Sequence, residues 1–437
     1  MNRQFSLLNI YHSFRKLKGN TRTSVLFEPL WGIPYLLYSF YLSLYMKSQG
    51  VSDAQIGFNI AIGFIAGAVF SLFGGIITDA LGRRRTTLIF DLISWPGAVL
   101  IYLFAHNFWM FALGTAINSL SRITGVSWNL MVVEDASEED TLTAYNLFNI
   151  TNIALGVITP LAGLIIKWAG IVSGERILLG FTVVSMTVMM LGRNYYYRET
   201  RIGKRVLAER RRGKKKFSLH LGHFQDTFVT LKMKPLLWIV IGVVVLFNAY
   251  MPIGTFSSLY YAPYLTEALQ LDKLDIAFLG GLGAAAIFFI LVFVTPSFPY
   301  QHRIKYMTTG FAIQILALLW FIFSPPGSLL SAALCVVLFA VGYGVAKPFL
   351  DTFLPAYTDG KERSGIFALH NTLISLLGAA GGFVSGFLYN LKPQYIYYLS
   401  IAVLLLCIIL LIVLSASHRK IALPEVNGGG MARPQGD

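Results

Sequence analysis

The chain has 437 residues, of which 55% are hydrophobic and 13% are charged, whereas a soluble globular domain carries about 25% charged residues. This composition excludes an ordinary soluble protein and predicts a polytopic membrane protein. The net charge of +14 does not indicate nucleic-acid binding, because the basic residues lie in short segments between apolar runs, where they suit anionic lipid headgroups. Cys335 and Cys407 both lie inside apolar runs, so we predict no disulfide, no metal site and no cofactor.

The apolar runs predict an all-α fold with twelve transmembrane helices, because a spanning helix needs about 20 mainly apolar residues. In chain order, the predicted helices cover residues 25–46, 55–78, 86–105, 108–132, 144–167, 175–195, 235–262, 274–296, 305–323, 328–350, 365–389 and 394–416. This pattern divides the chain into four regions. They are an N-terminal six-helix half (1–197), a basic central loop (198–234), a C-terminal six-helix half (235–418) and a cytoplasmic tail (419–437).

Lysine and arginine residues are distributed unequally between alternate loops. The predicted outer loops hold few basic residues, namely Lys47, Lys167, Arg176, Lys273 and Lys392. The predicted inner segments hold many more, including the arginines at 83–85 and those of the central loop. Because basic loops stay on the cytoplasmic side, we expect both termini in the cytoplasm and the protein in the inner or plasma membrane.

The two halves of the chain show weak internal similarity. Residues 144–149 in the predicted fifth helix are similar to residues 366–371 in the eleventh, and residues 52–56 are similar to residues 272–276. The two offsets are about 222 and 220 residues. Their agreement predicts a duplicated six-helix unit, an architecture in which secondary transporters place the substrate site at the interface between the repeats.

Residues 74–85, which we term the signature loop, lie between the predicted second and third helices. The glycines of this segment, among them Gly75 and Gly82, permit a tight turn and a close approach of helices. Arg83, Arg84 and Arg85 keep the turn at the cytoplasmic surface, because arginine enters hydrocarbon only at a high cost.

The pattern of Gly75, Asp79, Gly82 and three arginines between two apolar helices resembles the loop between the second and third helices of the major facilitator superfamily. The resemblance implies a transporter that works by alternating access. It also implies gating contacts at the inner face, in which Asp79 interacts with the amino end of the eleventh helix and the arginines pair with Glu134 and Asp135. In an alternative interpretation, some of the arginines only anchor to lipid headgroups.

Ionisable residues inside apolar helices need an explanation, because each costs at least about 2.5–3.5 kcal/mol in a membrane. Glu28 in the first helix and Arg122 in the fourth are the candidates for proton coupling. The position of Arg122 resembles that of an arginine in proton-coupled members of the family, although Gly125 follows it one residue earlier than in the family pattern. The alternatives are an interfacial acid at position 28 and an arginine at position 122 that extends to the inner headgroups.

Three other charged residues in predicted helices are expected to have structural roles. Asp91 lies in the third helix, which the resemblance places outside the substrate cavity. Lys347 and Asp351 have the i, i+4 spacing of a helical ion pair, so we interpret them as a structural or gating pair.

Aromatic and amide side chains in the predicted helices are candidates for lining a substrate cavity. They are Trp31, Tyr35, Tyr38, Trp128, Asn149, Asn248, Tyr250, Tyr343, His370 and Asn371. Asn149, His370 and Asn371 are favoured because they fall at repeat-related positions. The alternative for each aromatic residue is a place in a lipid-facing belt or in helix packing.

Together these features predict a major facilitator permease that moves a small-molecule substrate across the membrane, with proton coupling as a further hypothesis. Membrane lipids are the other expected partners, and we expect a monomer. No metalloprotease, nucleophile-elbow, phosphate-loop or ATP-binding pattern occurs in the sequence, so we do not expect an enzyme. The alternative function is that of a non-transporting sensor or lipid-handling protein on the same fold.

Overall fold

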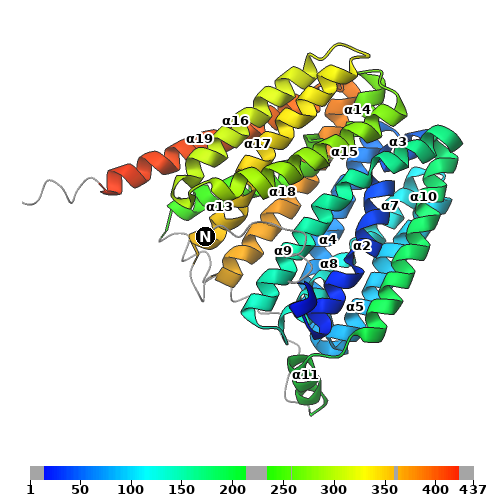
Figure 1. The fold of residues 1–437 in the computed structure, drawn as a ribbon, viewed down its shortest axis with the longest axis vertical. Helices are drawn as coiled ribbons and strands as arrows, with labels where there is room; N and C mark the ends of the chain where they lie inside the picture. Colours follow the sequence, from blue (N-terminus) through cyan, green and yellow to red (C-terminus); the bar gives the residue numbers. More distant parts are fainter. Residues whose placement is uncertain (1–13, 213–233, 257, 359–362, 423–437) are drawn as a thin grey trace, which may run out of the picture.

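The structure is a computed structural model that describes residues 14–212, 234–256, 258–358 and 363–422. Nearly all of these residues lie in helices, and no β-strand occurs among them. Figure 1 shows two groups of helices that converge where α3 (Leu42–Ser48) and α14 (Tyr261–Glu267) lie. The groups fan out toward the opposite end, beyond which α11 (Arg201–Arg211) lies. The predicted all-α fold is confirmed, while the central loop beyond α11 and most of the C-terminal tail lie outside the described residues.

The N-terminal group contains the first six predicted spans. Its other helices are α2 (Gly19–Ser39), α4 (Asp53–Leu81), α5 (Arg83–Leu92), α6 (Ala98–Phe104), α7 (Phe108–Asn118), α8 (Ser121–Val133), α9 (Glu138–Leu155) and α10 (Pro160–Tyr196). A π-helical turn, Ile93–Gly97, joins α5 to α6, and a 3-10 turn, Gly156–Ile158, joins α9 to α10. Within α10, Gly170 has a φ of +80°. This kink separates the predicted fifth and sixth spans.

The C-terminal group contains the remaining predicted spans. Its helices besides α14 are α13 (Leu236–Gly254), α15 (Lys273–Phe289), α16 (Arg303–Ile322), α17 (Leu329–Ala356), α18 (Arg363–Leu391) and α19 (Tyr395–Ala422). The prediction of one continuous seventh helix over 235–262 was wrong, because α13 ends at Gly254. Pro252 and Gly254 lie in its last turn, and proline and glycine are the two residues least favourable to a helix.

Among the described residues, nine helical segments are each long and apolar enough to cross a membrane. The difference from the twelve predicted spans has local causes. The first predicted span is divided between α2 and α3, and the fourth is divided between α7 and α8. The fifth and sixth form one continuous helical stretch, Glu139–Tyr196. Because each predicted span corresponds to a helix or to successive helices, the structure is consistent with a twelve-helix fold.

Helix α4, which leads into the signature loop, has well-defined ends. At the start of α4, the Ser52 side chain accepts a hydrogen bond from the Gln55 backbone (3.3 Å), and the Gln55 side chain accepts one from the Ser52 backbone (3.0 Å). This capping box fixes where the helix begins. At the other end, Gly82 has a φ of +87°, which residues with a side chain rarely adopt. Gly82 therefore ends α4 and lets α5 begin at the next residue.

Glycines allow the two groups to pack closely where they converge. A Cβ atom placed on Gly57 of α4 would lie 2.7 Å from the Cα of Gly386 in α18. One placed on Gly163 of α10 would lie 2.5 Å from the Cβ of Ala277 in α15. Such small residues bring helix backbones into contact within a membrane, so these two helix pairs form a tight seam between the groups.

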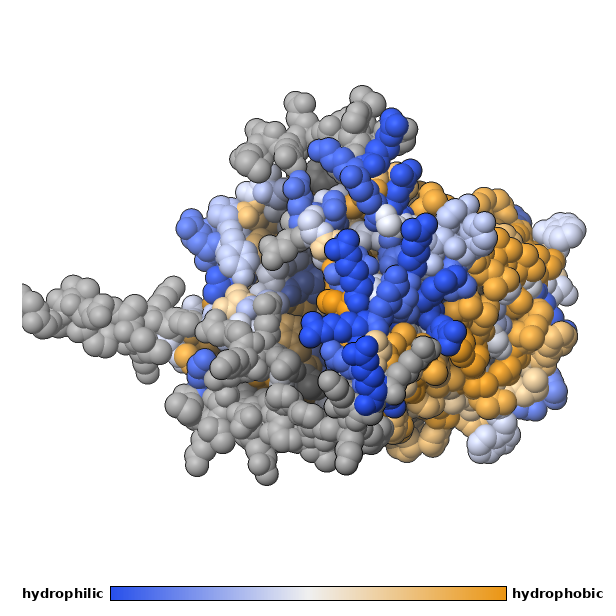
Figure 2. All heavy atoms as spheres, turned by 90° about the horizontal axis from the view of Figure 1, so that it is seen from below, coloured by the Kyte–Doolittle hydropathy of each residue, from blue (hydrophilic) through white to orange (hydrophobic). Residues whose placement is uncertain are grey.

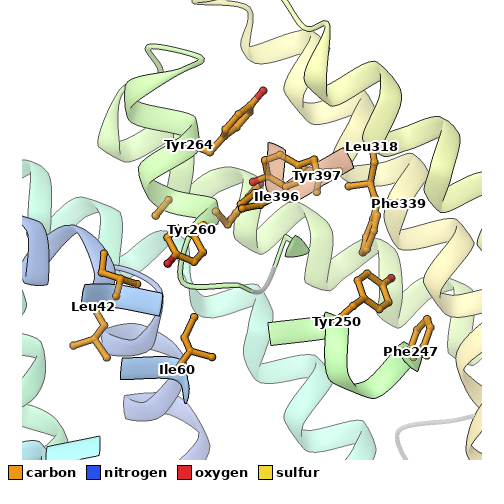
Figure 3. Close-up of a cluster of buried hydrophobic side chains, with 14 of the residues drawn as sticks. Leu42, Ile60, Phe247, Tyr250, Tyr260, Tyr264, Leu318, Phe339, Ile396 and Tyr397 are labelled. Atoms are coloured by element: carbon orange, nitrogen blue, oxygen red, sulfur yellow. The ribbon is translucent and has the colours of Figure 1, made fainter. Parts of the chain in front are cut away.

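A buried cluster continues this seam into the C-terminal group. Figure 3 shows Tyr260 between Leu42 and Ile60 of the N-terminal group and Ile396 of the C-terminal group. The Tyr260 hydroxyl donates to the backbone carbonyl of Asp53 at 2.9 Å. Tyr260 therefore joins the two groups of helices through both apolar contacts and a hydrogen bond.

Candidate functional site

The signature loop is fixed to its own half of the molecule by carboxylates. The Glu199 carboxylate accepts the backbone N–H of Arg83 at 3.0 Å and that of Arg84 at 3.1 Å. These are the first two residues of α5, whose N–H groups have no partner within the helix. A negative charge at this position also interacts favourably with the helix dipole, so Glu199 caps α5.

Arg83 is the central side chain of the loop. Its Nε and Nη2 atoms donate to the Glu134 carboxylate at distances of 3.0 to 3.3 Å, and its Nη1 atom donates to Asp79 at 3.1 Å. Thr200 also donates a hydrogen bond to Glu134. The Arg83 and Glu134 side chains are only 5% and 7% exposed. The end of α8, the signature loop and the start of α11 therefore meet in one buried polar cluster.

The other two arginines and the second acid are placed differently. Arg84 donates to the side chain and backbone oxygens of Asn194 at 3.1 and 2.8 Å, whereas the Arg85 side chain is exposed. Asp135 accepts the backbone N–H of Arg201 at 3.2 Å, at the start of α11. Of the two acids expected to pair with the arginines, Glu134 pairs with Arg83, while Asp135 caps α11.

Glycines bring α11 against the loop. A Cβ atom on Gly82 would lie 2.7 Å from Oε2 of Glu199, and one on Gly203 of α11 would lie 2.9 Å from Cδ of Arg83. Gly74 is also tightly packed, since its Cβ atom would lie 2.8 Å from Val126, but a Cβ atom on Gly75 would meet no described atom within 4 Å. Gly75 is thus not required by packing in this arrangement.

The proton-coupling candidate Glu28 lies beside a buried ion pair. The Glu28 carboxylate is half-buried and accepts a hydrogen bond from Asn152 of α9 at 3.4 Å. It lies within electrostatic reach of Asp91 and Arg193, which form an ion pair between α5 and α10 with side chains 5% and 7% exposed. Tyr197 packs against the Arg193 guanidinium, whose carbon lies 5.4 Å from the ring centre.

The Arg122 side chain is exposed and lies against α4. A Cβ atom on Gly67 would lie 3.3 Å from its Nε atom, so the small residue at position 67 makes room for the arginine. Within the described part of the chain, the Arg122 guanidinium has no hydrogen-bond or ion-pair partner. Arg122 and Glu28 are therefore not brought together in this structure.

The aromatic candidates of the first span pack against one another. Trp31 and Tyr35 are stacked with ring centres 5.0 Å apart, and both contact Trp95 of the third span edge-on. Tyr38 adjoins Tyr35 at 5.8 Å and is only 3% exposed. Tyr38 belongs to the core, whereas Trp31 and Tyr35 are half-buried.

Among the cavity candidates of the seventh and eleventh spans, one is buried in the core and the others are half-buried or exposed. Tyr250 is 3% exposed and donates to Gln314 at 2.9 Å, so it lies inside the C-terminal group. Asn248 donates back to its own helix. His370 and Asn371 contact each other at 3.3 Å, and Asn371 is exposed.

Three further residues complete the comparison with the predictions. Trp128 packs on Phe148 with ring centres 5.0 Å apart, and Tyr343 stacks on Phe247 at 6.3 Å. The side chain of Asn149 lies outside the described part of the structure. Lys347 and Asp351 form the predicted i, i+4 ion pair.

Opposite the signature loop, an ion-pair network closes the seam between the two groups. Lys47 contacts Asp53 at 2.7 Å within the N-terminal group and Glu267 at 2.5 Å in the C-terminal group. Tyr389 of α18 donates to Glu267 at 3.0 Å, and its ring stacks on Tyr260 at 4.8 Å. We refer to Lys47, Asp53, Glu267 and Tyr389 as the outer latch, because the sequence predicts Lys47 to lie in an outer loop.

Sequence reasoning missed the outer latch, and it also missed Glu199, Thr200 and Arg193. One signal was available for Thr200, because threonine immediately before an apolar and basic helix is a common helix cap. The latch residues gave no such signal, because Glu267 and Tyr389 lie far from Lys47 and Asp53 in the sequence.

A family model described as Major Facilitator Superfamily matches residues 32–355 and 300–429 of this chain. YqjV of Bacillus subtilis (strain 168), described as an uncharacterized MFS-type transporter, is 30% identical over 127 residues, which cover 28% of this chain and 30% of that relative. The chain thus matches less than a third of that relative's length.

Three solved structures are similar over almost the whole chain. A bacterial homologue of the iron transporter ferroportin in its inward-facing state has a TM-score of 0.67 at 18% identity, covering 94% of this chain and 100% of that one. A D-xylose-proton symporter has a TM-score of 0.67 at 14% identity, covering 90% and 96%. The ferroportin homologue in its outward-facing state has a lower TM-score of 0.56 at 18% identity, covering 91% and 100%. At these identities the likeness shows the fold.

Proposed function

Because this chain belongs to the Major Facilitator Superfamily, we propose that it is a membrane transporter rather than an enzyme and that it moves a small solute across the cell membrane by alternating access. The substrate site lies between the two six-helix halves, 1–197 and 235–418. Both termini face the cytoplasm, and the protein acts as a monomer.

The outer latch is the observation that carries this proposal. It joins the halves at the end where they converge, through the contact of 2.5 Å between Lys47 and Glu267. The opposite end carries the signature loop and α11, whose arginines and lysines favour the cytoplasm. A transporter closed outside and opened inside has this arrangement, and the closer match to the inward-facing ferroportin homologue supports it.

The signature loop acts as the inner gate in the opposite state. Arg83 is held by Glu134 and Asp79, so the loop moves as one body with the N-terminal half. When the inner end closes, the Asp79 carboxylate approaches the amino end of α18, where a negative charge is favourable. Opening inward then requires this contact to break.

Half-buried and exposed polar side chains between the halves supply the substrate site. Glu28, Asn152 and Arg122 contribute from the N-terminal half, and His370 and Asn371 contribute from the C-terminal half. Glu28 carries the coupled proton, because neutralising a carboxylate lowers the cost of keeping it among apolar helices. Arg122 provides a positive charge at the same interface.

Cross-linking of the outer latch tests alternating access. A thermal-shift screen of purified protein against sugars, amino acids, nucleosides, organic anions and cationic drugs first supplies a ligand, since binding to the folded state alone raises stability. Uptake of that ligand into proteoliposomes is then measured for the double variant Lys47→Cys/Glu267→Cys after treatment with a flexible bifunctional thiol reagent. We expect transport to stop and to return after reduction, because a locked latch prevents outward opening.

The single variant Lys47→Cys is the matched control, since the native Cys335 and Cys407 are buried. Transport that continues at full rate with quantitative cross-linking would contradict alternating access through this seam. Ligand binding without any transport by the native protein would favour a non-transporting sensor instead.

The role of Glu28 in proton coupling has its own test. Glu28→Gln is expected to make uptake independent of an imposed pH gradient, and unchanged pH dependence would exclude Glu28 as the coupling residue.

A further inference from the structure

A pocket of about 780 Å³ lies on the α11 side of the molecule, outside the interface between the halves. The end of α4 and the start of α5 contribute Leu81, Arg85 and Leu88, and α11 contributes Lys204 and Arg210. Figure 2 views this side of the molecule and shows hydrophilic side chains gathered on it. The proposed gate contacts use Asp79, Arg83 and Glu134, and none of these three residues lines the pocket.

The pocket has an excess of positive charge. Glu199, the one acidic residue among the described residues that line it, directs both carboxylate oxygens to the backbone N–H groups of the signature loop. Arg84 is bound to Asn194. By contrast, Arg85, Lys204 and Arg210 are exposed, and none of them has an ion-pair partner in the part of the chain that the structure describes. Several cations around one pocket favour a ligand with a phosphate group.

The surroundings of the pocket indicate the depth of a membrane interface. Tyr195 and Tyr196 are 79% and 61% exposed at the end of α10, and tyrosines of this kind lie at headgroup level. Leu81 and Ile89 are also exposed, at 40% and 42%. An apolar wall that continues from a basic pocket suits a ligand with a phosphate headgroup and acyl chains better than it suits a free phosphate.

We propose that this pocket between the signature loop and α11 binds the headgroup of an anionic phospholipid of the inner leaflet. The phosphate contacts Arg85, Lys204 and Arg210, and the acyl chains lie along Leu81 and Leu88. The pocket exists because Gly82 and Gly203 let α11 approach the loop. A bound lipid therefore stabilises the docked position of α11.

The test compares binding of phosphatidylglycerol to two variants that lose the same charge. The first is Arg85→Gln/Lys204→Gln/Arg210→Gln. The control is Arg198→Gln/Arg201→Gln/Lys305→Gln, which removes three exposed cations that do not line the pocket. Lipid binding is measured by native mass spectrometry in detergent, with the lipid-free melting temperature as the check on folding.

We expect the pocket variant to bind phosphatidylglycerol at least tenfold more weakly than the native protein, and the control to change by less than twofold. An equal loss in both variants would overturn the proposal, because it would show a general effect of charge. Equal affinity for phosphatidylcholine would overturn it as well. Saturable competition by glycerol 3-phosphate at the same concentration as the lipid would assign the pocket to a free phosphate.

If the triple variant does not fold, Lys204→Glu provides a second test on an exposed side chain of α11. It is expected to weaken phosphatidylglycerol binding at least fivefold, and unchanged binding would contradict the proposal. Since transport of the solute does not depend on this lipid in the proposed mechanism, failure here leaves the proposed function intact.

Discussion

The guanidinium of Arg83 and the carboxylate of Glu134 form a two-pronged ion pair, with side chains 5% and 7% exposed. Glu134 follows α8 directly, while Arg83 is the first residue of α5. The contact therefore joins the ends of two successive spans, at positions 51 residues apart in the sequence. Planar guanidinium and carboxylate groups match in geometry, which makes such pairs both strong and specific.

Removing one partner of this pair is expected to destabilise the protein strongly. Arg83→Gln or Glu134→Gln leaves a buried charge without its partner, which costs about 3–5 kcal/mol. The double variant is expected to lose much less than the sum of the two, because it leaves no buried charge unpaired. Unfolding free energies in detergent micelles measure this, and additive losses would show that the pair is not coupled. Arg205→Gln is the control, since Arg205 is 82% exposed in its pair with Glu209 and should cost less than about 1 kcal/mol.

The ion pair between Asp91 and Arg193 is expected to be structural. Asp91→Asn alone should destabilise by about 3–5 kcal/mol, because Arg193 then stays buried without its counter-charge. Asp91→Leu/Arg193→Met replaces the pair with apolar groups and should recover most of the native stability.

Transport by the double variant distinguishes two roles for this pair. A stable double variant that transports at the native rate agrees with a structural role. A stable double variant that no longer transports would contradict it and would place the pair in the coupling site beside Glu28.

The overall fold could be predicted because it depends on simple patterns. Apolar runs of about 20 residues and the unequal distribution of basic residues are sufficient for spans and topology. The breaks within spans were harder to predict. Pro252 indicated that the seventh span could divide, as it does after Gly254. The break between α7 and α8 gave no such indication, because the two residues between them, Ser119 and Leu120, are neither proline nor glycine.

The site was predicted less completely, because its contacts join residues far apart in the chain. The signature loop could be located from the sequence. The hydrogen bonds that Glu199 accepts from the loop's backbone could not, because they depend on where α11 packs. Arg193 was overlooked since it lies near the end of a predicted helix, where arginine is common. Tyr250 was expected in the cavity, yet its hydroxyl lies against Gln314 inside one half. Sequence alone does not tell which face of a helix points to the interface.

Adding one methyl group at the seam is expected to disturb the outer-closed state. In Gly57→Ala, the new Cβ would lie 2.7 Å from the Cα of Gly386, and backbone atoms cannot rotate away as side chains do. The helices α4 and α18 must therefore separate, which favours outward opening. We expect faster labelling of a cysteine introduced at Glu267, at least threefold, with impermeant thiol reagents.

Gly180→Ala is the matched control for this substitution. A Cβ atom there meets no described atom within 4 Å, and alanine in a helix is favoured over glycine by about 0.5–1 kcal/mol. Labelling should be unchanged in Gly180→Ala. Equal labelling in Gly57→Ala and the control would show that the seam tolerates the extra methyl group.

Glu175 is expected to reduce the stability of the protein. Its side chain is fully buried in α10, and neither carboxylate oxygen has a hydrogen-bond partner among the described residues. Tyr38 and Tyr41 are the titratable groups close enough to interact with it, and the Tyr41 hydroxyl donates instead to the Lys273 backbone across the seam. A buried polar group without a partner costs about 1–3 kcal/mol.

Glu175→Met replaces this carboxyl with an apolar side chain of similar length. The variant should therefore gain about 1–3 kcal/mol in unfolding free energy, whereas Glu175→Gln, which keeps a polar group, should change little. Melting temperatures in detergent give the first comparison. A loss of stability in Glu175→Met would show that the carboxyl has a partner, such as a buried water. A stabilised variant that no longer transports would instead mean that the protein retains Glu175 for its function at the expense of stability, a trade-off typical of functional sites.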